Sequence, residues 1–221
     1  MKKHNAFTMI ELIIVIVVIG ILATLTVPRM HRDNRLEAMQ YLLNMVRYTQ
    51  NLALHDNKQN DTNTSWQKAY WRFSVNRCSG SSDIYLYIGS DANYNGSIDT
   101  NEVVLDPSNG KPMFGNGYKN CSPTNNYGNA YSTNSFIKSK FGITNFKFAG
   151  CGFGTTQYMG FDNFGRVYRK FGSSTQPDYG DYSSSNDCTI EFEFGNSNES
   201  NFTIHVVPET GYAYVKENPN L

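Results

Sequence analysis

The sequence predicts an α+β protein in which a long N-terminal helix precedes a C-terminal, antiparallel β-rich head. Aliphatic residues crowd into the first thirty positions, and an apolar repeat at helical spacing continues to about residue 55. Beyond that point, short aromatic and β-branched runs alternate with Gly, Asn and Ser, as in strands joined by turns. The aromatic share of 14% is typical of a folded domain and not of a disordered chain.

The charges of the chain balance, with 19 Lys and Arg against 19 Asp and Glu in 221 residues. A nucleic-acid-binding domain needs a basic face, so the composition argues against nucleic acid as a partner. The length suits one large domain with an appendage.

The N-terminal apolar segment runs from Phe7 to Val27 and contains Glu11. As a helix it would be about 32 Å long, enough to cross the hydrocarbon core of a membrane. A secretory signal peptide has a shorter apolar stretch, so this reading is disfavoured. A carboxylate inside a membrane helix costs about 2.5–3.5 kcal/mol unless it is paired. We therefore expect a cationic partner for Glu11; the alternatives are a simple one-span anchor and a side chain that reaches the interface.

After Pro28 the helical period continues with polar residues on the other faces. The expected apolar face consists of Leu36, Met39, Leu43, Val46 and Ala53. We predict one helix from Phe7 to His55, about 70 Å long, with its apolar face packed on a sheet and with weak points at Gly20 and Pro28.

Nine runs in the rest of the chain have the pattern of strands. They are Ala69–Val75, Ile84–Ile88, Val103–Leu105, Asn145–Ala149, Gln157–Phe161, Val167–Phe171, Thr189–Phe194, Phe202–Val207 and Ala213–Lys216. The segment Asp106–Ser135 is rich in Asn, Gly, Pro and Ser and is expected to be irregular.

One twelve-residue segment, Asp91–Glu102, has the spacing of a calcium-binding loop, D-x-[DN]-x-[DN]-G-x5-E. The candidate Ca²⁺ ligands are Asp91, Asn93, Asn95, Ser97 through its carbonyl, Asp99 and Glu102. Gly96 would permit the sharp turn, and Ile98 would anchor the loop to the core. The alternative is an Asn- and Gly-rich turn between two strands. We predict a structural calcium ion of modest affinity, in the range of about 10⁻⁴–10⁻³ M.

The residues Ala6–Leu12 (AFTMIEL) resemble the class III prepilin signature of type IV pilins and of the pseudopilins of type II secretion. The resemblance implies cleavage between Ala6 and Phe7 by prepilin peptidase and N-methylation of Phe7. It also implies that Glu11 pairs with the Phe7 amine of a neighbouring subunit. Pro28 matches the family's proline, whereas Ala6 stands where the family usually has Gly.

Two further segments, Tyr158–Arg166 and Phe202–Val215, resemble hairpin elements of minor pseudopilins of the H and FimT-like group. The expected organisation is a leader at 1–6, a transmembrane and assembly half of the helix at 7–28, an amphipathic half at 29–56 and a periplasmic β-rich head at 57–221. The head has four cysteines, Cys78, Cys121, Cys151 and Cys188. In an oxidising space we expect two disulfides, with three possible pairings.

The resemblance implies a minor pseudopilin, a structural subunit of a type II secretion pseudopilus that is not an enzyme. It would lie in the bacterial inner membrane with a single pass and its head in the periplasm. Its partners would be other pilin-like subunits, prepilin peptidase and the inner-membrane assembly platform. The alternatives are a minor type IV pilin for DNA uptake or adhesion, and a membrane-anchored envelope enzyme. The four His residues are scattered, and no nucleophile, phosphate-loop or zinc-protease motif occurs.

Overall fold

The computed structural model describes residues 8–26, 34–79, 81–115, 121, 130–151, 154, 156–182, 186–196 and 199–216. The chain divides into two compact units, Met1–Asn34 and Arg35–Leu221. The first contains the helix α1 (Met9–Thr26), whose side chains from Met9 to Leu22 are exposed. Among the described residues, no helix combines the length and the apolarity that a membrane crossing requires.

The second unit begins with the helix α2 (Asn34–Leu54). Residues 27–33 lie outside the described residues, so the continuous helix from Phe7 to His55 stays a prediction. The buried face of α2 consists of Ala38, Leu42, Met45, Val46, Thr49 and Ala53. Val46 and Ala53 of the predicted face are buried, as expected, and Met39 and Leu43 are partly buried against the core, whereas Leu36 is 40% exposed.

The buried face of α2 differs from the predicted one because apolar residues occupy two adjacent stripes of the helix, and helical spacing alone fits both stripes. Ala38 is small enough for close packing and is fully buried. Thr49 enters the buried stripe because its hydroxyl donates to the carbonyl of Met45 at 2.8 Å. A satisfied hydroxyl can be buried without the cost of an unpaired polar group.

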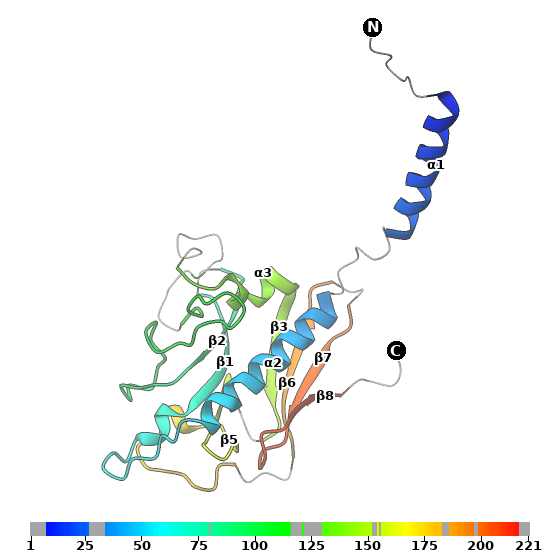
Figure 1. Cartoon of the computed structure of the whole chain (residues 1–221). Helices are drawn as coiled ribbons and strands as arrows, with labels where there is room; N and C mark the ends of the chain where they lie inside the picture. The colour runs from blue at the N-terminus through cyan, green and yellow to red at the C-terminus, as the bar shows by residue number, and fades with distance from the viewer. Residues whose placement is uncertain are drawn as a thin grey trace. The chain divides into compact units, whose positions relative to one another are not determined.

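The described part of the head contains two antiparallel four-stranded sheets, so the α+β prediction with a β-rich head is confirmed. The first sheet has the order β2-β1-β4-β5, and the second has the order β3-β6-β7-β8. The strands are β1 (Trp71–Arg77), β2 (Ile84–Gly89), β3 (Ile143–Ala149), β4 (Tyr158–Phe161), β5 (Val167–Tyr168), β6 (Cys188–Phe194), β7 (Phe202–Val206) and β8 (Ala213–Val215). Figure 1 shows α2 running along the head, with β1 and β2 to one side and β6, β7 and β8 to the other.

Several short elements differ from the sequence prediction. Val103–Leu105 forms no strand but makes isolated bridges, from Val103 to Gly89 and from Leu105 to Pro112. The chain after Tyr168 turns into the 3₁₀ helix η5 (Phe171–Ser173) instead of continuing as a strand. The helix α3 (Ile137–Phe141) and the 3₁₀ helices η2 (Trp66–Ala69) and η4 (Thr133–Ser135) were not predicted, because they are too short to carry a clear apolar period.

Two disulfides, Cys78–Cys121 and Cys151–Cys188, link the four cysteines of the head. Two cysteine pairs were expected, and the structure selects this one of the three pairings. In each bond, the two cysteines follow one another in the sequence with no other cysteine between them. The first ties the end of β1 to the irregular segment after β2, and the second ties the end of β3 to the start of β6.

The two sheets meet at one corner of the head, where the β4–β5 turn lies against the β7–β8 turn. Val167 N–H donates to the carbonyl of Pro208 at 2.8 Å. The side-chain amide of Gln50, from α2, donates to the carbonyls of Gly165 at 3.3 Å and of Thr210 at 2.7 Å. Gly165 and Gly211 have φ values of 81° and 65°, and a Cβ at Gly211 would collide with the carbonyl of Gly165. Glycine is therefore required at this corner.

Candidate metal-binding loop and N-terminal segment

The segment Asp91–Glu102 forms a closed loop between the end of β2 and the bridge at Val103. Ser90 N–H donates to the carbonyl of Glu102 at 3.2 Å, which joins the two ends. Ile98 is fully buried, as expected of the residue that anchors such a loop. A Cβ on Gly89 would lie 2.7 Å from the carbonyl oxygen of Glu102, so only glycine fits where the loop closes.

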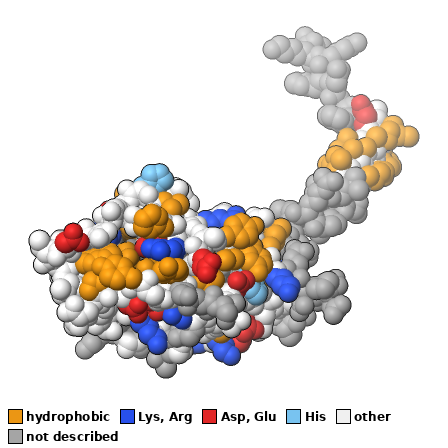
Figure 2. All heavy atoms as spheres, turned by 90° about the horizontal axis from the view of Figure 1, so that it is seen from below, with side chains coloured by type: hydrophobic (Ala, Val, Ile, Leu, Met, Phe, Trp, Pro, Cys, Tyr) orange, Lys and Arg blue, Asp and Glu red, His pale blue; other side chains and the backbone are white. Residues whose placement is uncertain are grey.

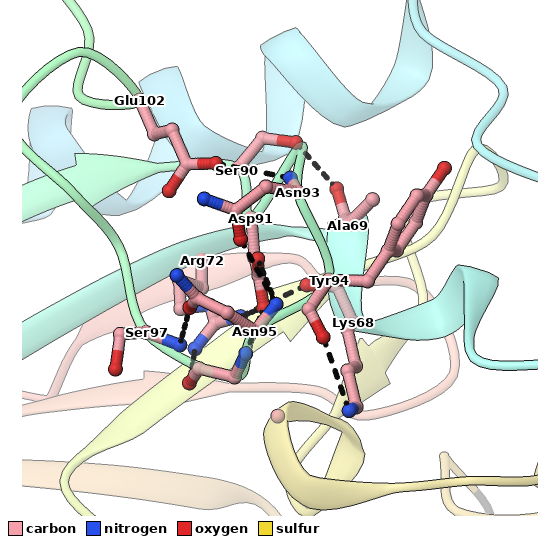
Figure 3. Close-up of polar contacts among 12 residues, drawn as sticks. Lys68, Ala69, Arg72, Ser90, Asp91, Asn93, Tyr94, Asn95, Ser97 and Glu102 are labelled. Carbon is pink, nitrogen blue, oxygen red and sulfur yellow. Dashed lines mark hydrogen bonds and ion pairs between the residues drawn. The ribbon is translucent and has the colours of Figure 1, made fainter.

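Side-chain oxygens inside the loop accept backbone N–H groups and fold it back on itself (Figure 3). Asp91 accepts the N–H of Asn95 at 3.0 Å and that of Gly96 at 2.7 Å. Asn93 Oδ1 accepts from Asn95 N–H at 2.9 Å, and Asn95 Oδ1 accepts from Ser97 N–H at 2.7 Å. These are local turns of the kind that Asp and Asn favour.

The remaining two acids of the motif face the same loop interior. Asp99 Oδ2 accepts the amide groups of Asn93 at 3.0 Å and of Asn95 at 3.1 Å. The two oxygens of Glu102 accept the N–H of Asn93 at 3.1 Å and that of Asp99 at 2.9 Å. The predicted ligand side chains are thus gathered in one loop, and each of the five accepts at least one hydrogen bond from a protein donor.

The fit of calcium to this loop can be judged from its donor set. Three carboxylates, two amide oxygens and the Ser97 carbonyl are the hard oxygen ligands that Ca²⁺ prefers. In the arrangement described, the amide nitrogens of Asn93 and Asn95 point at Asp99, so both amides must turn over to offer oxygen to a cation. Within the described residues, no group of three or more His, Cys, Asp or Glu is arranged to hold a metal ion.

A buried arginine, Arg72 of β1, lies beneath the loop and was not predicted from the sequence. Its side chain is 3% exposed and lies 3.6 Å from Asp91 Oδ2. Its guanidinium donates to the carbonyls of Gly96 at 3.3 Å and of Lys68 at 2.8 Å. Burial lowers the pKa of Arg72 and raises the pKa of Asp91. The loop is therefore held to the sheet by a charged group from a distant part of the chain.

Two further contacts fasten the loop to η2 and its flanks. Lys68 Nζ donates to the carbonyl of Tyr94 at 3.2 Å, and Ser90 Oγ donates to the carbonyl of Ala69 at 2.6 Å (Figure 3). Tyr94 has φ of 60° and Gly96 has φ of 94°, so the loop reverses direction between these anchors.

In the N-terminal segment, Glu11 and Thr8 form a reciprocal cap at the start of α1. Thr8 Oγ1 accepts the N–H of Glu11 at 3.3 Å. The carboxylate of Glu11 accepts the N–H and the hydroxyl of Thr8, both at 3.0 Å. The sequence Thr8-Met9-Ile10-Glu11 is thus a capping box, a signal that was available in the sequence and was missed. The predicted cleavage site, Ala6 and Phe7, lies outside the described residues.

Residues 1–27 match a family model described as the prokaryotic N-terminal methylation motif. This match supports a type IV pilin-like protein with a class III prepilin N-terminus. Comparison with curated proteins and with solved structures gave no match.

Proposed function

We propose that this protein is a structural subunit of a type IV pilin-like filament, specifically a minor pseudopilin of a type II secretion pseudopilus. The observation that carries the proposal is the methylation motif at residues 1–27, which includes the helix α1 with its exposed side chains from Met9 to Leu22. A helix with an exposed apolar surface needs an apolar environment, which a membrane first supplies and the packed helices of a filament supply afterwards. The motif is typical of structural subunits, so we propose no enzymatic activity.

Assembly would depend on the carboxylate of Glu11. Cleavage between Ala6 and Phe7 creates a new amine, and that amine on a neighbouring subunit would neutralise Glu11 inside the apolar bundle. Thr8 holds the Glu11 carboxylate at the helix N-terminus. The same positive end of the helix also favours a negative charge. This pairing would fix the axial offset between subunits.

The assignment to a secretion pseudopilus is supported by the charge pattern of the chain. The net charge is zero, and on the face seen in Figure 2 acidic and basic side chains are interspersed between apolar patches. A head that binds DNA through phosphate contacts needs a concentration of basic residues.

We further propose that the head lies in the periplasm and that the loop 91–102 holds a structural Ca²⁺ ion through Asp91, Asn93, Asn95, Ser97, Asp99 and Glu102.

The decisive measurement is mass spectrometry of the chain isolated from bacterial membranes, with and without active prepilin peptidase. We expect the mature chain to begin at a methylated Phe7, and the uncleaved chain to accumulate when the peptidase is absent. A chain that keeps Met1 and Lys2 beside an active peptidase would overturn the proposal.

The assembly step is tested with Glu11→Gln, which keeps the size of the side chain and removes its charge. We expect this variant to be inserted and cleaved but not incorporated into filaments. Ile16→Leu, in the same helix, serves as the matched control and should assemble normally.

The phenotype of cells that carry Glu11→Gln separates the two kinds of filament. Loss of toxin or enzyme export indicates a pseudopilin, whereas loss of DNA uptake indicates a competence pilin.

A further inference from the structure

A lysine, an asparagine and a buried aspartate meet where the irregular segment after β2 packs against α3. Asn134 belongs to η4, and Lys140 belongs to α3. Lys140 Nζ donates a hydrogen bond to Asn134 Oδ1 at 2.6 Å. The amide nitrogen of Asn134 donates to Asp106 Oδ2 at 2.8 Å. One side-chain amide therefore has an amine at its carbonyl oxygen and a carboxylate at its nitrogen.

The carboxylate of Asp106 is fully buried and held in place by hydrogen bonds. It accepts the N–H and the hydroxyl of Ser108, at 2.9 Å and 2.7 Å, and the hydroxyl of Ser132. Burial acts to raise the pKa of Asp106, but the hydrogen bonds from Ser132, Ser108 and Asn134 outweigh it, and the pKa is lowered. Asp106 is therefore an ionised carboxylate beside the amide nitrogen of Asn134.

The amine of Lys140 lies over two aromatic rings, and the residue is partly buried. Its Nζ lies 4.7 Å from the ring centre of Tyr41 and 4.9 Å from that of Phe141. Tyr41 also donates its hydroxyl to the backbone carbonyl of Asn134 at 3.2 Å, which fixes the position of the amide. The hydrogen bond to Oδ1 holds this amine beside the side-chain carbonyl group of Asn134, where Nζ can attack the carbonyl carbon once it has lost a proton.

We propose that Lys140 and Asn134 condense to an isopeptide bond within the folded head, with Asp106 as the general acid–base group. The ammonium group of Lys140 first releases one proton to water. Its Nζ then attacks Cγ of Asn134, the Nζ–Cγ bond forms, and the π electrons of the carbonyl group move to Oδ1. In the tetrahedral intermediate both nitrogens are bonded to Cγ, so the carboxylate beside Nδ2 takes a proton from Nζ and delivers it to Nδ2. The Cγ–Nδ2 bond then breaks, and ammonia leaves.

The reaction balances without an oxidant or a cofactor, because one amine and one amide give one new amide and ammonia. The product joins η4 to the last residues of α3, and so closes the end of the irregular segment covalently. This link is independent of the proposed function, since it rests only on contacts within the head.

The test uses the full chain purified from membranes, reduced, alkylated and digested with trypsin. Trypsin does not cut after an acylated lysine, so the cross-linked chain should give one branched product. That product joins peptide 120–138 to peptide 139–147 and is lighter than their sum by one ammonia molecule. Separate, unmodified peptides from the wild-type chain would overturn the proposal.

Three variants make the result specific. Lys140→Arg keeps the positive charge and should lose the branched product. Lys138→Arg is the matched control, because Lys138 donates to the backbone carbonyl and the hydroxyl of Ser82, at 2.9 Å and 2.7 Å, and not to a side-chain amide. This variant should keep the product. Asp106→Asn, with folding verified by circular dichroism, should lower the yield at least tenfold. An undiminished yield in folded Asp106→Asn would refute the acid–base role.

Ammonia can also leave Asn134 by cyclisation with the backbone of Ser135. That product contains no branch, still allows cleavage after Lys140 and reopens in mild base. Finding this cyclic product in place of the branched one would also refute the isopeptide bond.

Discussion

Single residues decide the geometry of the loop 91–102 and of the cluster around Asp106. The loop residues were predicted because the motif is contiguous: its acids, amides, Gly96 and the buried Ile98 all occur within twelve positions. Arg72 and the group of Asp106, Asn134 and Lys140 were not predicted. Their contacts join residues from separate parts of the chain, and no local pattern reports which of these will meet.

Asp106 leads to a prediction about pH at the residue scale. Its pKa in the folded head is lower than the ordinary value, which is about 3.9 in an unfolded chain. The ionised carboxylate therefore contributes stability that is fully present above the unfolded pKa and is lost as the pH falls through the lower folded pKa. We expect Asp106→Asn to destabilise the head at pH 7 and to have a smaller effect near pH 3.

The measurement is urea unfolding followed by Trp fluorescence, since Trp66 and Trp71 both lie in the head. Both chains should carry Lys140→Arg, so that a cross-link does not enter the comparison. An equal effect of Asp106→Asn at both pH values would contradict the prediction.

At the scale of elements, the type of most helices and strands could be predicted, and their partners could not. β6 alternates buried and partly buried residues from Cys188 to Phe192, as its sequence predicts. The sheet order β2-β1-β4-β5 depends on contacts between distant segments and has no local signature. For α2 the period was predicted and the buried face only in part, at Val46 and Ala53, because two neighbouring apolar stripes satisfy the same spacing.

The buried face of α2 can be tested by comparing two adjacent leucines. Leu42 is fully buried, and Leu43 is partly buried against the core. We expect Leu42→Ala to lower the free energy of unfolding by about 2–5 kcal/mol, because it leaves a cavity. Leu43→Ala should cost about 1 kcal/mol. Urea unfolding curves of the two variants decide the matter, and a larger loss for Leu43→Ala would restore the face predicted from the sequence.

The loop 91–102 is tested by its response to Ca²⁺. If the dissociation constant is near 10⁻³ M, about 10 mM Ca²⁺ should stabilise the chain by about 1.4 kcal/mol relative to a chelator. The thermal midpoint should rise accordingly. Asp99→Asn preserves the shape of the side chain and should abolish the response. An unchanged midpoint in the wild-type chain would show that the loop is only a turn.

At the scale of the whole molecule, the two disulfides constrain the head by closing long segments of the chain. They close chain segments with sequence separations of 43 and 37 residues. Chain-entropy arguments give about 4 kcal/mol for each loop of this length. Secreted domains with long irregular loops depend on such bonds.

We therefore expect the double variant Cys151→Ser/Cys188→Ser to unfold at a clearly lower urea concentration than the oxidised wild-type chain. Cys78→Ser/Cys121→Ser should show a comparable loss. The check is the same fluorescence titration, with and without reductant. If reductant leaves the wild-type midpoint unchanged, the bonds contribute little to stability.

The corner formed by Gln50, Gly165 and Thr210 has a mechanical consequence. One amide from α2 is bonded to the turn of the first sheet and to the turn of the second. Traction transmitted along α2 would therefore load both sheets together at a single point, instead of peeling one sheet away from the other.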